Sequence, residues 1–178
     1  MYWEKCQHEC FNYFILSADS EFLMIPKNLQ NYLNLCKRLS ILLEPVQGEI
    51  VNCSFPGWDM PIDLKIRYPE LHWMAFFGKP YIELFGREKL LNAPCHQVIP
   101  IGEDTVALQL TDDLFQPIPH EARQRIKDYL GVDSFVEEGK YYRSYKTGIV
   151  PKFDFSNVLF DKNLCPVEIP IRMKGTKQ

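Results

Sequence analysis

The chain has 178 residues, of which 46% are hydrophobic and 24% are charged, and its formal net charge is −3. This composition is that of a globular protein with an ordinary core, and it excludes a disordered chain rich in charge and poor in aromatic residues. The negative charge argues against nucleic-acid binding, because neutralising phosphates requires a clustered surplus of lysine and arginine. The length predicts one domain over residues 1–178.

Two further features bear on location. The sequence has no apolar run of 18 residues that could cross a bilayer, and Met1–Cys10 lacks the charged and apolar regions of a signal peptide. We therefore expect no membrane partner and a cytoplasmic location. The six cysteines are scattered through a chain large enough to fold without cross-links, so we expect reduced thiols that pack as small apolar groups.

The first predicted elements are a strand and a helix. Cys10–Leu16 is short, apolar and aromatic and stops at turn residues, which predicts an inner strand. Lys27–Leu43 has apolar residues three and four positions apart and polar residues on the other face, which predicts an amphipathic helix. Pro45 ends this helix, because proline lacks a backbone donor and biases the preceding residue away from helical geometry.

The middle of the chain predicts shorter elements. Glu49–Phe55 alternates in part and predicts a second strand. Prolines punctuate the stretch that follows, and for Leu71–Phe77 a buried strand and a helical turn both stay open. Pro80–Asn92 predicts a helix with Pro80 in its first turn, although Gly86 within it costs about 1 kcal/mol relative to alanine.

A hairpin and a second amphipathic helix are predicted next. Two β-rich runs, Cys95–Ile101 and Thr105–Leu110, flank Gly102–Asp104, which has the length and residue types of a hairpin loop. Pro119–Leu130 predicts a helix that ends before Gly131. Strands and helices follow one another in mixed order, which predicts an α+β fold: a mostly antiparallel sheet with two to three helices packed on it.

The densest group of metal-ligating residue types is near the start of the chain, where Cys6, His8 and Cys10 lie within five residues. Structural zinc sites pair two such groups, and the other cysteines stand alone at distant positions. We therefore predict no metal site, with this group as the alternative that the sequence leaves open.

The sequence contains no phosphate-binding loop, dinucleotide-binding fingerprint or nucleophile elbow. We therefore predict no cofactor and assign no catalytic residues. The enzyme alternative is a small hydrolase or transferase whose site is assembled from distant residues, with Cys95, His96 and Glu83 as participants. Against it, Cys95 and His96 are neighbours in a predicted strand and would point to opposite faces.

The segment His72–Pro94 combines large aromatic side chains with charged groups. In one interpretation the aromatic side chains fill the core, and Glu83 pairs with Arg87 across one helical turn. In the other, the exposed part of the segment joins the acidic loop Gly102–Asp104 to form a binding surface. The sequence leaves both interpretations open.

The order of elements in this part of the chain carries a resemblance. Phe77–Pro94, the hairpin at Gly102–Asp104, Val106–Thr111 and the helix Ala122–Leu130 resemble small stand-alone bacterial proteins of uncharacterised families. Some of these resemble the immunity proteins encoded beside polymorphic toxins. The resemblance covers about residues 71–136 and implies a cytosolic α+β domain without catalytic residues, which acts by binding a toxin and often masks its active site.

The leading hypothesis is therefore a non-enzymatic protein-binding protein, an immunity protein that neutralises a cognate toxin by direct binding. An acidic surface suits a basic toxin, because complementary charge speeds association. A further alternative is a homo-oligomeric structural module, such as a homodimer with a self-complementary aromatic interface. The candidate contacts are four acidic residues and two aromatic anchors: Glu103, Asp104, Asp112, Asp113, Tyr81 and Trp58.

Overall fold

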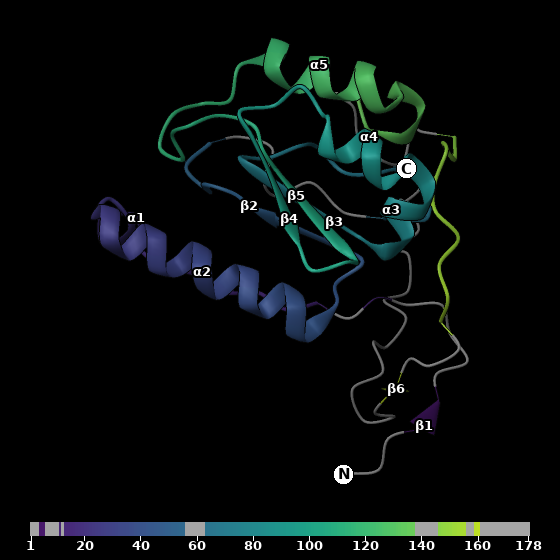
Figure 1. The fold of residues 1–178 in the computed structure, drawn as a ribbon, viewed down its shortest axis with the longest axis horizontal. Coiled ribbons are helices and arrows are strands. Elements are labelled where there is room, and N and C mark those ends of the chain that lie inside the picture. Colours follow the sequence, from purple (N-terminus) through teal and green to yellow (C-terminus); the bar gives the residue numbers. More distant parts are fainter. Residues whose placement is uncertain are drawn as a thin grey trace, which may run out of the picture. The chain divides into compact units, whose positions relative to one another are not determined.

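The computed structural model of the protein describes residues 4–5, 11, 13–55, 63–137, 146–155 and 159–160. The backbone divides into two compact units, one formed by Ser17–Lys152 and the other by the flanking segments Met1–Leu16 and Phe153–Gln178. Each unit has a sheet of its own (Figure 1). The prediction that residues 1–178 form one domain stays a prediction.

The smaller unit contains a two-stranded antiparallel sheet, in which β1 (Glu4–Lys5) pairs with β6 (Leu159–Phe160). The ring of Phe11 meets the rings of Phe153 and Phe155 edge to face, with centroids 5.0 and 5.1 Å apart. Such contacts each stabilise by roughly 0.5–1.5 kcal/mol beyond the burial of area. They tie the two ends of the chain together within this unit.

The predicted inner strand Cys10–Leu16 is wrong for residues 11 and 13–16, which form no strand. The side chains at 13–15 are 63–84% exposed. The remaining residues of the prediction, Cys10 and Asn12, lie outside the described residues. An apolar run forms a buried inner strand only where another element packs against it. The residue types of the run do not show whether such an element is present.

The larger unit is built on a four-stranded antiparallel sheet in the order β2-β3-β5-β4 (Figure 1). Together with the helices that pack on it, this sheet confirms the predicted α+β class. The central strands β3 and β5 are buried along their whole length, whereas β2 and β4 form the edges. The strands are β2 (Gln47–Ile50), β3 (Met74–Gly78), β4 (Gln97–Ile101) and β5 (Thr105–Gln109).

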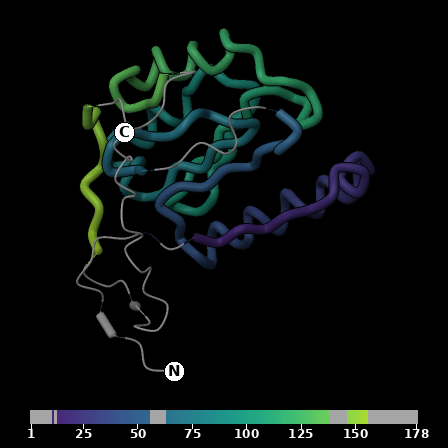
Figure 2. The backbone as a smooth tube through the Cα atoms, turned by 180° about the vertical axis from the view of Figure 1, so that it is seen from behind, coloured from purple at the N-terminus to yellow at the C-terminus, as the bar shows by residue number. Residues whose placement is uncertain are grey.

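Helices lie on both sides of this sheet, as Figure 1 and the reverse view in Figure 2 show. On one side are α1 (Ser20–Leu23) and α2 (Pro26–Leu43). On the other side are α3 (Lys79–Phe85), α4 (Arg87–Leu91) and α5 (His120–Leu130). The unit therefore has two separate apolar layers, one on each face of the sheet.

The predicted amphipathic helix is confirmed as α2. It begins at Pro26, whose ring suits the first turn of a helix. It ends at Glu44, which adopts the left-handed conformation (φ 44°, ψ 54°) and donates its N–H to the carbonyl of Ser40, before Pro45 prevents continuation. The face that packs on the sheet carries Leu29, Tyr32, Leu33 and Cys36, as the spacing of apolar residues predicts.

The predicted hairpin and the last predicted helix are confirmed as β4–β5 and α5. Ile101 pairs with Thr105 across the three-residue loop, and Gly131 follows α5 with a φ of 121°. The open choice for Leu71–Phe77 is settled as a strand from Met74 onward.

Two predicted elements differ from the structure. The strand predicted over Glu49–Phe55 ends at Ile50, because Asn52 forms a local turn in which its side chain accepts the backbone N–H of Ser54 at 3.0 Å. The single helix predicted over Pro80–Asn92 is divided at Gly86, which has φ 86° and ψ 130° and separates α3 from α4. Glycine adopts this conformation at little steric cost, whereas other residues do not.

The face of the sheet toward α3, α4 and α5 encloses a buried group of five rings, which we call the aromatic core: Tyr68, Phe77, Tyr81, Phe85 and Phe135. Tyr68 stacks on Phe77 with centroids 4.9 Å apart, and Phe85 stacks on Phe135 at 5.9 Å. Backbone bonds of 2.7 and 3.0 Å hold the Tyr68 peptide between Ser134 and Val136. Segments far apart in the sequence thus meet in one closed layer.

The opposite face packs against α1 and α2 through a second buried cluster. Phe76 belongs to this cluster although its neighbour Phe77 belongs to the aromatic core, because successive residues of a strand point to opposite faces. Met74, Ile50 and Ala107 pack with Phe76 in this layer.

Candidate functional site

The four acidic residues predicted to contact a partner do not form one surface. Glu103 and Asp104 are exposed at the tip of the β4–β5 hairpin, whereas Asp112 and Asp113 follow the opposite end of β5. The five residues of β5 alone span about 17 Å. The two acidic pairs therefore lie too far apart to act as a single compact acidic patch.

The hairpin loop does meet the segment His72–Pro94, as one interpretation of the sequence expected. The guanidinium of Arg87 donates to the backbone carbonyl oxygen of Gly102 at 2.9 Å and also to that of Glu103. These bonds place a positive charge beside the acidic loop and so offset part of the negative charge at that end of the hairpin. Arg87 therefore holds the loop Gly102–Asp104 in place, the loop that was expected to contribute to an acidic binding surface.

The two predicted aromatic anchors have different outcomes. Tyr81 is 1% exposed and belongs to the aromatic core, so its prediction as a surface anchor is corrected. The residue lies on the sheet-facing side of the short helix α3, and desolvation in that position raises the pKa of its phenol. Trp58 lies outside the described residues.

The surroundings of Cys95, His96 and Glu83 do not favour the enzyme alternative, in which these residues take part in a catalytic site. The thiol of Cys95 donates to the carbonyl of Gln97 at 3.3 Å, and burial raises the pKa of this thiol, which disfavours the thiolate that a nucleophile requires. His96 and Glu83 are exposed. Cys6, His8 and Cys10 lie outside the described residues, and the described part of the chain contains no group of three or more side chains that could hold a metal ion.

The most unusual surface of the larger unit lies on α1, α2 and the turn between them. We call it the α1–α2 apolar surface. Its large side chains are exposed at levels between 43% and 76%, although most of them belong to a helix that also has a buried face. The residues are Phe22, Met24, Ile25, Leu35, Ile41, Leu42 and Leu43.

The geometry of α2 explains why these side chains stay exposed. Consecutive residues of a helix are 100° apart, so the run Ile41–Leu43 spans about 200° of the circumference and cannot face the sheet as a whole. Leu35 and Leu42 are seven positions apart and therefore lie on the same side of the helix. The apolar run Ile41–Leu43 is the signal in the sequence that indicates this surface.

The charged residues on α2 are all basic. Lys27, Lys37 and Arg38 lie within Pro26–Leu43, and the helix contains no acidic residue. The α1–α2 apolar surface is bordered by charges of both signs, because Glu21 lies in α1 and Glu44 directly follows α2. The exposed apolar side chains lie at both ends of α2, about 24 Å apart from Ile25 to Ile41, with Leu35 between them. Large apolar side chains exposed beside charged groups are a usual mark of a protein-binding surface.

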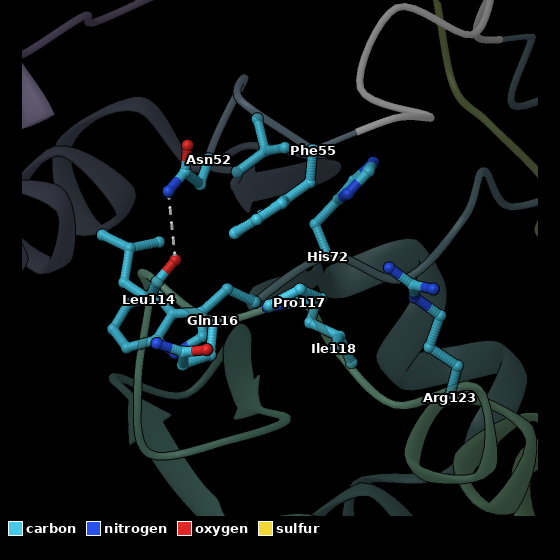
Figure 3. A pocket seen from close by; sticks show the side chains of 10 residues that line it. Asn52, Phe55, His72, Leu114, Gln116, Pro117, Ile118 and Arg123 are labelled. Carbon is cyan, nitrogen blue, oxygen red and sulfur yellow. Dashed lines mark hydrogen bonds between the residues drawn. The ribbon is translucent and has the colours of Figure 1, made fainter.

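A pocket of about 270 Å³ lies in the same unit, between the end of β2, the residues before β3 and the loop after β5 (Figure 3). Figure 3 shows the imidazole of His72 and the guanidinium of Arg123 on one side and Asn52 on the other. The side chain of Asn52 donates to the carbonyl of Leu114 at 3.4 Å, which links two of the pocket's walls. Arg123 is held by a 3.0 Å bond from its Nε to the carbonyl of Leu71.

A buried carboxyl–imidazole pair lies beside this pocket. Oε2 of Glu49 is 3.7 Å from Nε2 of His72, too far for a hydrogen bond. Desolvation raises the pKa of Glu49 to about 7, and desolvation followed by the charge of Arg123 lowers the pKa of His72 to about 4. Near pH 6 the pair is therefore neutral, with the proton on the carboxyl group.

A second buried pair lies nearby and is fully satisfied. Nζ of Lys127 is 2.7 and 2.9 Å from the two carboxylate oxygens of Glu70 and also donates to the carbonyl of Val136 at 2.9 Å. The backbone N–H of Leu71 donates to Glu70 at 2.8 Å. Because the two charges are paired, we assign Lys127 and Glu70 a structural role: they link α5 to the segment that precedes β3.

Sequence reasoning did not identify Glu49, His72 or Arg123 as a group. Each stands alone in the sequence without a motif, and they come from three separate segments. The available signal is His72, a titratable residue within the apolar, buried run Leu71–Phe77, whereas Glu49 on the edge strand β2 carries no such signal.

Comparison with protein-family models, curated proteins and solved structures finds no match to this chain. Among the described residues, no helix has both the length and the apolar composition needed to span a bilayer.

Proposed function

We propose that the protein is a non-enzymatic binding protein that docks a partner protein on the α1–α2 apolar surface. The observation that carries the proposal is the exposure of seven large apolar side chains on α1, α2 and the turn between them. Fully burying a side chain such as Leu42 stabilises by about 1.5–3 kcal/mol, so a partner that covers several of them gains substantial binding energy.

The chemistry of the surface specifies the partner. On α2 the apolar side chains are bordered by Lys27, Lys37 and Arg38, so the part of the partner that faces this helix carries a protruding apolar group flanked by acidic residues. This differs from the basic partner expected from the four acidic residues, which the fold divides between the two ends of the hairpin. A cognate toxin, as the resemblance to immunity proteins implies, fits the proposal if the face that it presents is acidic.

A second copy of the chain suits this surface less well. Pairing two α2 helices would bring three basic residues from each copy toward one another, and the acidic residues Glu21 and Glu44 lie only before and after this helix. Like charges in an interface oppose association. A separate acidic partner is therefore the occupant to test.

The experiment uses the product of the gene adjacent to the one that encodes this protein. Isothermal titration calorimetry measures its affinity for the full chain and for Leu42→Asp, which places a charge at the most exposed residue of the surface. We expect at least a hundredfold loss of affinity, because an aspartate there would bury a charge against the apolar group of the partner. Val132→Asp is the matched control, because Val132 is also an exposed apolar residue but lies outside α1 and α2.

Three outcomes contradict the proposal. One is an adjacent gene product that does not bind, and another is binding that Leu42→Asp and Val132→Asp weaken equally. The third is a wild-type dimer in analytical ultracentrifugation that Leu42→Asp dissociates, which would assign the surface to a second copy. Relief of the toxicity of the adjacent gene product on co-expression tests the immunity form of the proposal.

A further inference from the structure

The two edge strands of the four-stranded sheet, β2 and β4, differ in the backbone groups that they turn away from it. In an antiparallel pair, the N–H and C=O groups of successive residues point alternately toward the partner strand and away from it. One bond fixes this alternation for β2, because the N–H of Gly78 in β3 donates to the carbonyl of Val46 at 3.0 Å. Gly48 therefore also turns its backbone groups toward β3, whereas those of Gln47 and Glu49 point away from the sheet.

The same alternation assigns the outward groups of β4. The N–H of Leu110 donates to the carbonyl of Trp73 at 2.9 Å, so the even-numbered residues of β5 bond to β3 and the odd-numbered ones to β4. Val98 and Pro100 lie opposite even-numbered residues of β5, and their backbone groups therefore point away from the sheet. Because proline has no N–H, Val98 is left as the outward donor of β4, and this edge resists the addition of a strand.

The edge of β2 carries a full set of outward groups. Gln47 and Glu49 each have an N–H and a C=O that point outward, and both residues are partly exposed. Among the described residues, no backbone hydrogen bond outside the sheet involves these groups. A row of unpaired donors and acceptors at a sheet edge is a template for pairing with another strand. The open edge of this sheet is therefore β2.

A second copy of β2 matches this edge. Antiparallel pairing through the outward groups places Gln47 opposite Glu49 of the second copy, with Gly48 opposite its own equivalent on a two-fold axis. Gln47 and Glu49 then each donate and accept a backbone hydrogen bond across the axis. Gly48 lies in the closely spaced type of pair, where the absence of a side chain allows two backbones to approach.

The side chains favour this register over its neighbours. Glu49 lies opposite the uncharged amide of Gln47, so no like charges face each other directly. Shifting the register in one direction would place Glu49 opposite Glu49 of the second copy. Shifting it in the other direction would place Glu49 opposite Pro45, which has no N–H to donate.

This pairing ends at two copies. A two-fold contact uses the same edge of both copies, so the joined sheet is bounded by β4 on each side. Pro100 interrupts the outward donors of that strand, which prevents the sheet from growing further.

We propose that two copies of the protein pair through β2 into one continuous antiparallel sheet. The observations that carry the proposal are the outward groups of Gln47 and Glu49, the self-complementary register and the block at Pro100. A strand of four residues offers less area than the roughly 800 Å² per partner of a stable complex, so the dimer is weak and depends on concentration.

The test begins with sedimentation velocity of the full protein over a dilution series from about 1 mM to about 10 µM. We expect the fraction of dimer to rise with concentration. Hydrogen exchange followed by NMR then identifies the strand at the contact. The amide protons of Gln47 and Glu49 should exchange several times more slowly at the highest concentration than at the lowest, whereas that of Val98 should exchange at the same rate.

Variants of the two edges add a second measurement. Gln47→Pro removes an outward donor, as Pro100 does in β4, and should weaken the dimer about tenfold or more. Val98→Pro is the matched control, because it removes the outward donor of the other edge and should dimerise as the wild type does. Gln47→Glu is a milder variant that places like charges opposite each other, and it should weaken the dimer severalfold. Circular dichroism checks that each variant is folded.

The proposal is overturned if the wild type is a monomer at the highest concentration, or if Val98 gains protection in place of Gln47 and Glu49. Equal weakening in Gln47→Pro and Val98→Pro would also overturn it. If Gln47→Pro does not fold, the exchange measurement on the wild type and the result for Gln47→Glu decide.

A final comparison separates this dimer from the proposed docking of a partner protein. β2 contains no residue of the α1–α2 apolar surface, so Leu42→Asp should dimerise as the wild type does. A dimer that Leu42→Asp dissociates would overturn the pairing through β2, because it would assign the contact to the α1–α2 apolar surface.

Discussion

The two faces of the four-stranded sheet are covered to different extents. Toward α3, α4 and α5, the aromatic core is closed, and all five of its rings are 9% exposed or less. Toward α1 and α2, a buried cluster also forms, but the covering helices leave seven large apolar side chains in solvent. The closed face accounts for stability by packing alone, whereas the open face has apolar area beyond what the fold needs. This difference locates the proposed docking function on α1 and α2.

The largest expected effect contrasts one residue from each face. Phe77→Ala should lower the free energy of unfolding by about 3–5 kcal/mol, because it removes a fully buried ring and leaves a cavity in the aromatic core. Leu42→Ala should change it by no more than about 0.5 kcal/mol, because Leu42 is 76% exposed. Urea denaturation followed by circular dichroism measures both. A loss of more than about 2 kcal/mol in Leu42→Ala would mean that α2 is part of a closed layer.

The next effect concerns the buried pair Glu49 and His72, whose contributions to stability depend on pH in opposite directions. The raised pKa of Glu49 gives stability that is complete below its unfolded value of 4.5 and is lost as the pH rises through about 7. The lowered pKa of His72 gives stability that is complete above its unfolded value of 6.5 and is lost as the pH falls through about 4. Between pH 4.5 and 6.5 the two slopes oppose each other in the wild type.

Single substitutions should separate the two contributions. The shifts correspond to about 3 kcal/mol each. Relative to wild type, Glu49→Gln should gain about this amount of stability as the pH rises from 4 to 7, and His72→Gln should lose a similar amount over the same range. The charged or titratable groups near the pair are Arg123, Glu70 and Tyr68, and both variants retain them. Urea midpoints collected across this pH range provide the measurement, and parallel curves for wild type and both variants would refute the assignment.

The smallest expected effect tests the break between the two short helices on the closed face. Gly86→Ala should cost about 1–2 kcal/mol, because the φ of 86° is strained for alanine even though no atom lies within 4 Å of the added Cβ. Gly48→Ala is the control, since Gly48 has no positive φ and its Cβ would make an ordinary 3.5 Å contact with Phe76. A stabilised Gly86→Ala variant in thermal melts would show that α3 and α4 can join into the single predicted helix.

Local patterns along the chain are sufficient to specify several elements of the fold. The apolar spacing in Lys27–Leu43, the glycine after Leu130 and the loop Gly102–Asp104 between two β-rich runs each specify an element through neighbours along the chain. These elements, together with their mixed order, were enough to predict the α+β class. Helix periodicity and turn chemistry require no knowledge of what packs against them.

The burial of individual side chains and the contacts between distant residues follow from the packing of the layers and not from local patterns. Tyr81 and Ile41 look equally suited to a core, but Tyr81 faces the sheet while Ile41 is turned to solvent. Glu49, His72 and Arg123 come together through strand pairing and the packing of α5, which no local pattern records. Burial and long-range contact depend on how the layers close, and for this reason the α1–α2 apolar surface and the pocket emerged from the fold and not from the sequence.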